Sequence, residues 1–142
     1  MRVVLDTNVL VSGILNPFGA PGRIVDLLRS GVLELVADDR ILAEYADVLL
    51  RERFDRYLPP EAREDLLDFL CRETDRIACS VSVSGLPHAG DACFLETALS
   101  AGVPLITGNT RHFPAALSKG CEVLTPSEFL ANYAGKPDGP PE

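Results

Sequence analysis

The sequence predicts an α/β fold whose mainly parallel sheet is covered by helices on both faces. Short apolar runs alternate with amphipathic stretches along the chain, which is typical of successive β-α units. An apolar run such as Val3-Val4-Leu5 indicates a buried strand. With 142 residues, 46% of them hydrophobic, the chain has the size of one ordinary domain with a single core.

The first half of the chain contains two expected strands and two expected helices. Apolar runs predict strands at residues 3–5 and 33–36. Apolar residues at helical spacing predict one helix around residues 24–29 and another across residues 40–53. Pro59-Pro60 then separates these elements from the next helix.

The second half continues the alternation and closes with a capped helix. A short helix starts near Pro126, with Thr125 or Ser127 as its cap. The Gly- and Pro-rich residues 134–142 are expected to form a disordered tail, which leaves a single domain over residues 1–133. The expected elements before Pro126 are a helix over 61–72, a weak strand near 77–78, a helix over 92–100, and strands at 104–107 and 122–124.

The cysteines and the apolar pattern predict a cytoplasmic protein. No two cysteines form a C-x-x-C pair and none lies at zinc-like spacing from histidine, so we expect reduced thiols. The apolar runs are short and broken by charges, and the first residues have no long apolar core. We therefore expect neither a membrane span nor a secretory signal. The cysteines are Cys71, Cys79, Cys93 and Cys121.

The net charge of −8 argues against broad, sequence-independent coating of nucleic acid. Such binding neutralises phosphates with Lys and Arg. It does not exclude a local site, because bound divalent ions reverse the local sign of charge where a phosphate approaches.

Asp6 is the first candidate site residue, because it ends the first expected strand. In open parallel sheets, ligands bind at the carboxyl ends of the strands, where the chain turns into the next helix. The alternative is a helix cap, since Asp favours the N-cap before an apolar run such as Val9-Leu10-Val11. Asp6 alone does not decide between the two.

Glu44 is the second candidate, because it lies with Ile41 and Tyr45 on the apolar face of its expected helix. An inward carboxylate is unfavourable unless it is paired, protonated or bound to metal. The alternatives are a boundary residue that reaches solvent, or an ion pair with Arg40 or Arg51.

Asp91 and Asn109 are two further candidates at element ends. Asp91 opens the expected helix over 92–100, where an acid is also an ordinary helix-start residue. Glu96, further along this helix, is expected to face away from Asp91. Thr107-Gly108-Asn109 follows an apolar strand, and its amide is able to hydrogen-bond water on a metal, although Gly-Asn is also common in turns.

The carboxylates of Asp6, Glu44 and Asp91 are far apart in sequence. Each lies near the edge of a β-α unit or on an inward helical face, which fits a hard-cation site better than three independent coincidences. Mg²⁺ or Mn²⁺ is the expected metal, because these ions take carboxylate oxygens and water in near-octahedral geometry. One or two such ions activate water and polarise a phosphodiester. Hydrolysis would then need no histidine or cysteine nucleophile.

The motifs together resemble the PIN domain, a small ribonuclease fold that is widespread among the toxins of bacterial toxin–antitoxin pairs. The resemblance spans most of the chain, and the order and spacing of its motifs are more specific than any one of them. The motifs are Val4-Leu5-Asp6-Thr7-Asn8-Val9, Glu44, Asp91-x-x-Phe94-Leu95-Glu96-x-Ala98, Thr107-Gly108-Asn109-x-x-His112-Phe113 and Leu124-x-Pro126-x-Glu128-Phe129-Leu130.

This resemblance implies a three-layer α/β/α sandwich with a central sheet of about five strands and an acidic pocket for Mg²⁺ or Mn²⁺. Asp6, Glu44 and Asp91 match the metal-binding, catalytic acids of the family. Asn109 stands where many members have a fourth Asp, so we expect weaker binding of a second ion. The resemblance also implies an RNA substrate, a homodimer, and an antitoxin partner whose Arg or Lys plugs the acidic groove.

Neighbouring polar residues are assigned supporting roles. Thr7 and Asn8 are expected to hold Asp6 and its water, with helix capping as their alternative role. Thr107 is a further supporting residue, and Arg111 is a candidate for contacting phosphate.

Three other features are expected to be structural. His88 is interpreted as a loop residue, with contact to substrate as the alternative. His112 is interpreted as a residue that orders its loop by packing against Phe113, with a role in catalysis as the alternative. The arginines of residues 51–56 are further candidates for contacting phosphate, but at least two of the three are expected to form a salt-bridged surface.

Metal-dependent hydrolysis of RNA phosphodiesters is the leading functional hypothesis, with single-stranded or looped RNA favoured over regular duplex. An aspartyl-phosphate phosphotransferase is the enzymatic rival, because Asp6 also suits a nucleophile. Asn8 argues against it, since an amide cannot replace the acid–base Asp usual at that position. The non-enzymatic rival is a catalytically weak PIN-like scaffold that binds RNA or a protein, because Asn109 lowers the charge of the site.

Overall fold

A five-stranded sheet forms the centre of the molecule, with strand order β3-β2-β1-β4-β5. The computed structural model describes residues 1–133. Every neighbouring pair of strands is parallel, so the sheet expected to be mainly parallel is parallel throughout. The central strand β1 pairs Val3 with Leu35 of β2 and Leu5 with Ile106 of β4. The strands are β1 (Arg2–Leu5), β2 (Glu34–Ala37), β3 (Asp75–Arg76), β4 (Leu105–Ile106) and β5 (Val123–Leu124).

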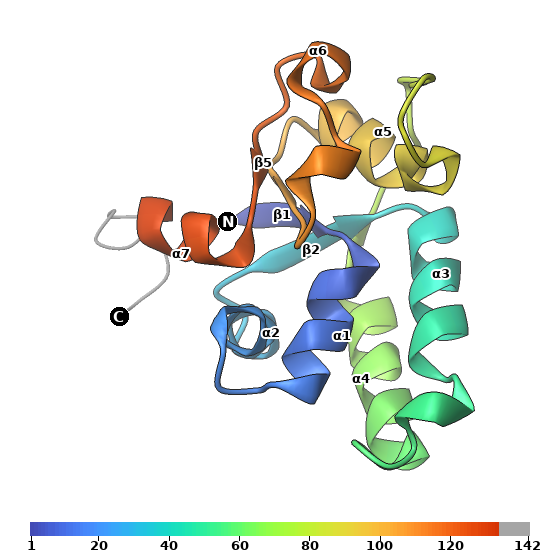
Figure 1. The fold of residues 1–142 in the computed structure, drawn as a ribbon. Helices are drawn as coiled ribbons and strands as arrows, with labels where there is room; N and C mark the ends of the chain where they lie inside the picture. The colour runs from blue at the N-terminus through green and yellow to red at the C-terminus, as the bar shows by residue number, and fades with distance from the viewer. Residues whose placement is uncertain (134–142) are drawn as a thin grey trace.

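Helices cover both faces of the sheet, which confirms the predicted three-layer α/β/α arrangement. Figure 1 shows α1, α2 and α4 below the sheet and α5 and α6 above it. Within residues 1–133, no helix is long and apolar enough to cross a membrane. The helices are α1 (Thr7–Leu15), α2 (Ala20–Arg29), α3 (Asp39–Leu49), α4 (Pro60–Glu73), α5 (Ala92–Ala101), α6 (Ala115–Ser118) and α7 (Pro126–Tyr133), with 3₁₀ turns η1 (Glu52–Phe54), η2 (Ala89–Asp91) and η3 (Thr110–His112).

The helix expected around residues 24–29 begins earlier, at Ala20. Pro21 occupies its first turn, where a missing N–H leaves no helical hydrogen bond unmade. Gly22 lets this turn approach the preceding loop, because a Cβ atom there would lie 2.1 Å from the Pro17 carbonyl oxygen. The start of α2 therefore depends on close packing of the backbone, and the spacing of apolar residues does not predict it.

The helix expected across residues 40–53 ends at Leu49 and gives way to the 3₁₀ turn Glu52–Phe54. The reason is Arg63 of α4, whose side chain is completely buried. Its Nη1 donates to the carbonyl oxygens of Leu49 at 2.6 Å and Arg51 at 3.1 Å. These carbonyls are thereby satisfied without a further helical turn.

The strand expected at residues 77–78 is wrong by two positions, because β3 is Asp75–Arg76. Asp75 pairs with Val36 in the sheet, and its carboxylate accepts a hydrogen bond from the Arg2 guanidinium. An edge strand tolerates such charged residues, so a search for apolar runs misses it.

The C-terminal helix has the capping box that its sequence predicts. The Thr125 N–H donates to Glu128 Oε1 at 3.0 Å, and the Glu128 N–H donates to Thr125 Oγ1 at 3.1 Å. Thr125, and not Ser127, is therefore the cap. The short helix α6 was not predicted, and the tail predicted at residues 134–142 lies outside the described residues.

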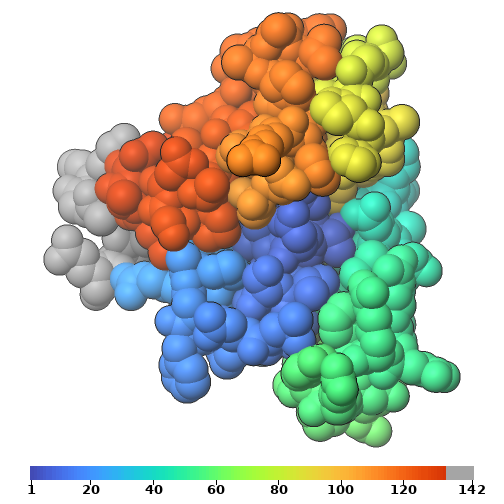
Figure 2. Space-filling model, in the orientation of Figure 1, coloured from blue at the N-terminus to red at the C-terminus, as the bar shows by residue number. Residues whose placement is uncertain are grey.

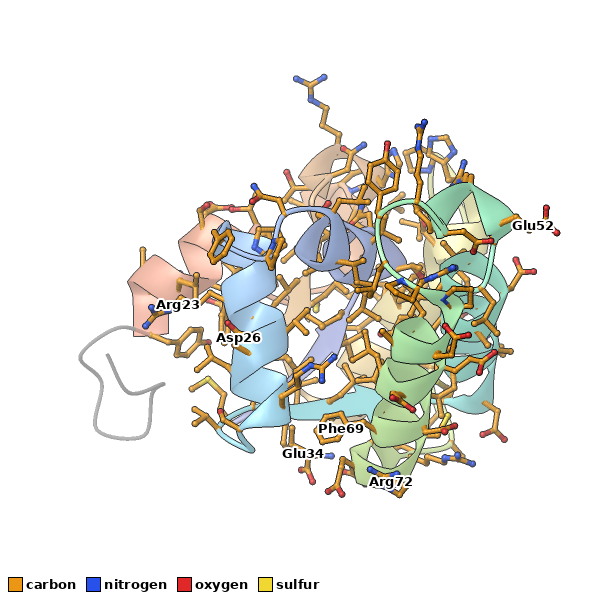
Figure 3. The ribbon with its side chains drawn as sticks, turned by 90° about the horizontal axis from the view of Figure 1, so that it is seen from below. Arg23, Asp26, Glu34, Glu52, Phe69 and Arg72 are labelled. Atoms are coloured by element: carbon orange, nitrogen blue, oxygen red, sulfur yellow. The ribbon has the colours of Figure 1, made fainter. Side chains whose placement is uncertain are left out.

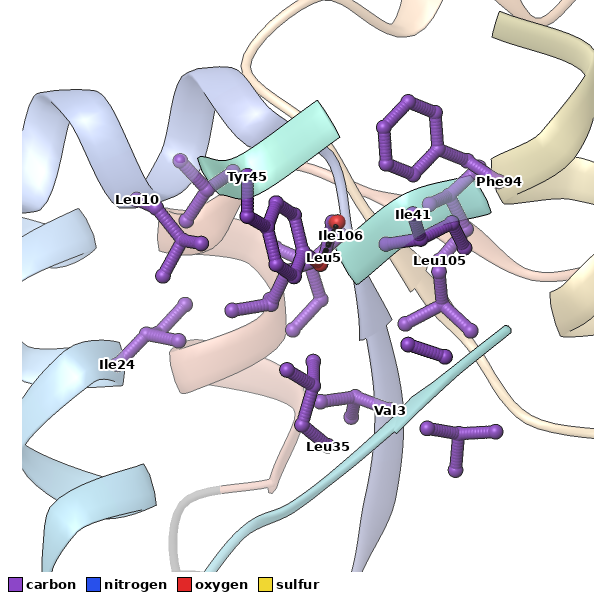
Figure 4. Packing of buried hydrophobic residues seen from close by; sticks show 14 of the residues in the cluster. Val3, Leu5, Leu10, Ile24, Leu35, Ile41, Tyr45, Phe94, Leu105 and Ile106 are labelled. Carbon is purple, nitrogen blue, oxygen red and sulfur yellow. Dashed lines mark hydrogen bonds between the residues drawn. The ribbon is translucent and has the colours of Figure 1, made fainter. Parts of the chain in front are cut away.

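The core packs around β1, whose Val3, Val4 and Leu5 are completely buried. Figure 4 shows Tyr45 of α3 lying beside Leu5. The Tyr45 hydroxyl donates to the Leu5 carbonyl oxygen at 2.6 Å, which satisfies its polar end inside the core. This bond fixes α3 against the carboxyl end of β1, beside the first candidate acid. The four cysteines are free thiols, as expected.

Candidate active site

Asp6 lies at the carboxyl end of the central strand and is only 6% exposed. Its N–H donates to the Ile106 carbonyl oxygen at 2.9 Å, and its Oδ2 accepts from Thr107 Oγ1 at 2.8 Å. Asp6 occupies the N-cap position of α1, but its side chain makes no capping hydrogen bond. The capping alternative therefore does not account for the carboxylate.

Glu44 reaches the same edge from the middle of α3. It is half-buried, and its carboxylate accepts a hydrogen bond from the Thr7 hydroxyl. Thr7 thus holds Glu44, whereas the sequence predicted that it would hold Asp6. The alternative ion pairs of Glu44 do not form within residues 1–133, because Arg40 pairs with other carboxylates and Arg51 pairs with Asp47.

Asp91 is the last residue of η2 and immediately precedes α5. Like Asp6, it stands at an N-cap without making a side-chain capping bond. Its Oδ2 is buried and lacks a hydrogen-bond partner within the described residues. His112 Nδ1 lies 3.1 Å from this oxygen, so the contact is a close electrostatic one without the alignment of a hydrogen bond.

The three candidate acids share one electrostatic environment. Burial is the main cause that raises the pKa of Asp6, and the hydrogen bond from Thr107 opposes it. The negative charges of Asp91 and Glu44 raise the Asp6 pKa further. Burial and the Glu44 charge likewise raise the pKa of the Cys93 thiol to about 12. The fold therefore gathers uncompensated negative charge at this edge.

A polar chain runs from Asp6 along the loop after β4. Thr107 Oγ1 donates to Asp6 and accepts from the Asn109 N–H at 3.1 Å. The Asn109 side-chain nitrogen lies 2.8 Å from His112 Nε2. Asn8 joins the same loop, because its Oδ1 accepts from the Gly108 N–H at 3.1 Å. The Asn8 side chain thus ties α1 to this loop, and only its backbone N–H acts on Asp6, by lowering the carboxyl pKa.

The sequence did not predict the contacts of the two histidines. His112 touches Asn109 and Asp91, and its ring centroid lies 4.2 Å from that of His88. Figure 2 shows the yellow segment before α5 and the orange segment after β4 side by side on the surface. The contact between His112 and Asn109 could have been predicted from their spacing of three residues, because a 3₁₀ turn brings residues three apart onto one side.

Glu96 is buried on α5 but serves a different network. Its Oε1 accepts from Arg40 Nη1 at 2.8 Å and its Oε2 from the Val83 N–H at 2.8 Å. This agrees with the expectation that Glu96 does not share a ligand with Asp91. The carboxylate fastens the irregular segment before η2 to α3 and α5.

The candidate phosphate-binding arginines differ in their surroundings. Arg111 is exposed and forms no ion pair within the part of the chain that the structure describes. In the 51–56 run, Arg51 pairs with Asp47 at 3.0 Å, while Arg53 and Arg56 each lie 4.9 Å from an aromatic ring centroid. The run is a paired and stacked surface, so Arg111 is the freer cation.

The oxygen donors of Asp6, Glu44 and Asp91 suit a hard cation, although the three side chains do not converge on a common metal position. Among residues 1–133, no three His, Cys, Asp or Glu side chains form a group that could hold a metal ion as they stand. Two features nevertheless favour a cation: Asp91 Oδ2 is buried without a hydrogen bond, and neighbouring carboxylates raise the Asp6 pKa. A divalent ion would neutralise both, and carboxylate oxygens are the ligands that Mg²⁺ and Mn²⁺ prefer.

Two cavities lie away from the acids. One, of about 350 Å³, is lined by the ends of α2 and α4 and by the start of β2. Figure 3 shows two of its lining residues, Glu34 and Phe69, close together. The other, of about 390 Å³, lies between α5 and the loop before β5. Neither contains a candidate acid.

Comparisons with known proteins agree with this architecture. A PIN domain family model matches residues 2–111. An uncharacterized protein of Methanocaldococcus jannaschii is 36% identical over 63 residues, which are 44% of this chain and 41% of that protein. The chain therefore matches about two-fifths of the length of this relative.

Two solved structures share the fold at low sequence identity. VapBC-1 from nontypeable Haemophilus influenzae is 17% identical with a TM-score of 0.58, over 89% of this chain and 99% of that one. FitAcB from Neisseria gonorrhoeae is 18% identical with a TM-score of 0.55, over 88% and 98%. The sheet order, the acids at its carboxyl edge and the family match lead to one conclusion: this chain belongs to the PIN domain family.

Proposed function

We propose that this protein is a Mg²⁺- or Mn²⁺-dependent endoribonuclease that hydrolyses RNA phosphodiesters. The observation that carries the proposal is the set of carboxylates at the carboxyl edge of β1. Asp6 and Asp91 make no capping bonds, Glu44 pairs with no Lys or Arg among residues 1–133, and the charges of Asp91 and Glu44 raise the Asp6 pKa. Acids whose charge no neighbouring cation neutralises are candidates for function.

Asp6, Glu44 and Asp91 would hold the ion. When bound, Mg²⁺ or Mn²⁺ supplies an activated water and a polarised phosphodiester. Thr107 holds Asp6, and the Thr7 hydroxyl holds Glu44, so neither carboxylate rotates freely. These contacts keep the oxygens in fixed positions before the substrate arrives.

Asn109 and Arg111 would set how substrate and metal bind. The Asn109 amide has no charge, so we propose that one ion binds tightly and that a second needs the RNA phosphate to complete its ligands. Exposed Arg111, beside Asn109, would contact a phosphate of the RNA. A titration that finds two tight Mn²⁺ sites in the isolated protein would contradict the single-ion proposal.

A catalytically weak scaffold that binds RNA or a protein is the second candidate. It is favoured by the absence, among residues 1–133, of a ready group of three metal-ligating side chains, together with the amide at Asn109. A scaffold would bind RNA without cutting it and would not respond to EDTA.

An antitoxin protein is the partner that we propose, because the fold is shared with structures of VapBC assemblies. The gathered negative charge at Asp6, Glu44 and Asp91 would accept an Arg or Lys of that partner. We further propose that the protein is cytoplasmic and that it forms a homodimer. Light scattering of the purified chain would test the dimer.

The test is cleavage of a mixed pool of labelled structured and unstructured RNA with Mn²⁺, beside an EDTA control. Glu44→Gln should reduce cleavage by at least about 100-fold, because it removes a charged ligand. Asp47→Asn is the matched control on the same helix, since Asp47 is exposed and Arg51 is its one ion-pair partner among residues 1–133. Intact RNA under every condition, or equal loss in both variants, would contradict the proposal; intact but bound RNA would favour the scaffold.

A further inference from the structure

We infer that His112 is a positioning residue of the site, which acts by holding Asp91 and Asn109 in place. The inference rests on the proposed function, because it concerns the same carboxylates. His112 bridges two loops that are distant in sequence: its Nε2 lies 2.8 Å from the Asn109 side-chain nitrogen, and its Nδ1 lies 3.1 Å from Asp91 Oδ2.

The two contacts of His112 require one arrangement of protons. An amide nitrogen only donates, so Nε2 of His112 accepts from Asn109 and carries no proton in the neutral ring. The ring proton is then on Nδ1, the nitrogen that lies 3.1 Å from Asp91 Oδ2. Neutral His112 therefore carries its proton on the nitrogen beside an oxygen that has no hydrogen-bond partner among the described residues.

This histidine completes a continuous chain of polar contacts. Asp6 accepts from Thr107, Thr107 accepts from the backbone of Asn109, and the Asn109 side chain meets His112. Asp91 lies at the start of α5. Among the contacts within residues 1–133, the contact with His112 is the one that links Asp91 to these polar residues. His112 thus connects the candidate ligand after β1 with the candidate ligand before α5.

The position of His112 is itself fixed from both sides. It ends η3, and its ring is tilted against that of His88 with a centroid separation of 4.2 Å. A ring held by a turn and by a neighbouring ring defines the direction of both nitrogen atoms. The role that fits these contacts is to orient a carboxylate and an amide, with no contact between His112 and the reacting atoms.

The experiment measures Mn²⁺ affinity of the isolated protein by EPR, beside the unfolding temperature of the metal-free protein. His112→Ala should weaken Mn²⁺ binding by about 10- to 100-fold, the usual effect of removing a group that orients a metal ligand. His112→Asn should recover affinity, because its amide nitrogen can stand near the original Nδ1 and face Asp91. His112→Gln reaches Asn109 instead, so it should recover less.

Thr110→Ala is the matched control, since Thr110 lies in the same 3₁₀ turn and its side chain makes no hydrogen bond within the described residues. It should bind Mn²⁺ like the wild type. If wild type binds and His112→Ala binds equally well, the inference is wrong and the proposed function stands. If folded wild type binds no Mn²⁺, both are wrong. Equal weakening in the Asn, Gln and Ala variants would also overturn the inference, because a positioning role requires rescue.

Discussion

Asp6 and Asp38 occupy equivalent places in the fold and behave in opposite ways. Each follows a parallel strand, β1 or β2, and each is the N-cap residue of the next helix. Their exposures are nearly the same, 6% for Asp6 and 7% for Asp38. The two carboxylates differ in their partners and in how deeply each is buried, with Asp6 the deeper of the two.

Asp38 is fully partnered. Its Oδ1 accepts from the Ile41 N–H at 3.0 Å, and its Oδ2 accepts from Arg40 Nε at 2.7 Å and from the Cys79 thiol at 3.4 Å. Burial raises the Asp38 pKa, but these three partners outweigh it and lower the pKa. The carboxylate is thus stabilised in its charged form and closes the first turn of α3.

Asp6 has one side-chain hydrogen bond, from Thr107, and no cationic partner within residues 1–133. Burial, together with Asp91 and Glu44, raises its pKa above the ordinary value. The comparison teaches that a buried acid at a strand end contributes to stability when donors surround it. The same acid placed among other acids lowers stability, and a bound cation would remove that penalty.

The largest expected difference between the two residues is in RNA cleavage. Asp6→Asn should reduce Mn²⁺-dependent cleavage by at least about 100-fold, because it removes charge from the proposed metal site. Asp38→Asn should leave cleavage within about threefold, since an Asn side chain can still cap α3. Initial rates on one labelled RNA measure both. Similar losses in the two variants would remove the distinction between them.

The second difference is in the stability of the metal-free protein, where the two variants should shift in opposite directions. Asp6→Asn should raise the unfolding temperature, because it removes a charge that the fold disfavours. Asp38→Asn should lower it, because it removes a charge that the fold favours. We expect shifts of roughly 3 to 5 °C, the size that about 1 kcal/mol produces in a domain of this length. Calorimetry in EDTA measures both.

The pH dependence of unfolding sharpens this prediction. The lowered pKa of Asp38 means that its stabilisation is present above the ordinary value of 3.8 and is lost as the pH falls below it. The raised pKa of Asp6 means that its penalty is present at neutral pH and is relieved as the pH falls toward 3.8. Urea unfolding measures the free energy of unfolding of each variant against wild type. As the pH falls toward 3.8, the gain in Asp6→Asn should shrink, while the loss in Asp38→Asn should persist. A stability gain in Asp6→Asn that does not change with pH would contradict the raised pKa of Asp6.

The smallest effect tests the hydrogen bond that the Asp6 carboxylate accepts from the Thr107 side chain. Thr107→Val keeps the shape of a fully buried side chain but removes its donor to Asp6 Oδ2. The Asp6 pKa should rise further, and Mn²⁺ affinity should fall by about tenfold. NMR titration of the Asp6 carboxyl carbon measures the first, and calorimetric titration the second. An unchanged carboxyl pKa would show that the hydrogen bond from Thr107 does not contribute to it.

The positions of most elements follow from local patterns in the sequence. The helix over 92–100 was predicted to within one residue, and the cap at Thr125 is visible in the sequence because Glu128 follows three residues later. The end of α3 and the position of β3 were missed. Both depend on long-range contacts, of Arg63 in the first case and Arg2 in the second.

The sequence by itself determined the alternation of strands and helices, and it singled out Asp6, Glu44 and Asp91 because charged residues at strand ends and on apolar helix faces are unusual. Only the tertiary structure decided what each acid does. The chain after β1 and the chain after β2 both contain an Asp at the same place, and the sequence does not distinguish them. Donors from α3 and Cys79 surround Asp38, whereas Asp6 meets other carboxylates, because charge interactions depend on distances that only the packed fold defines.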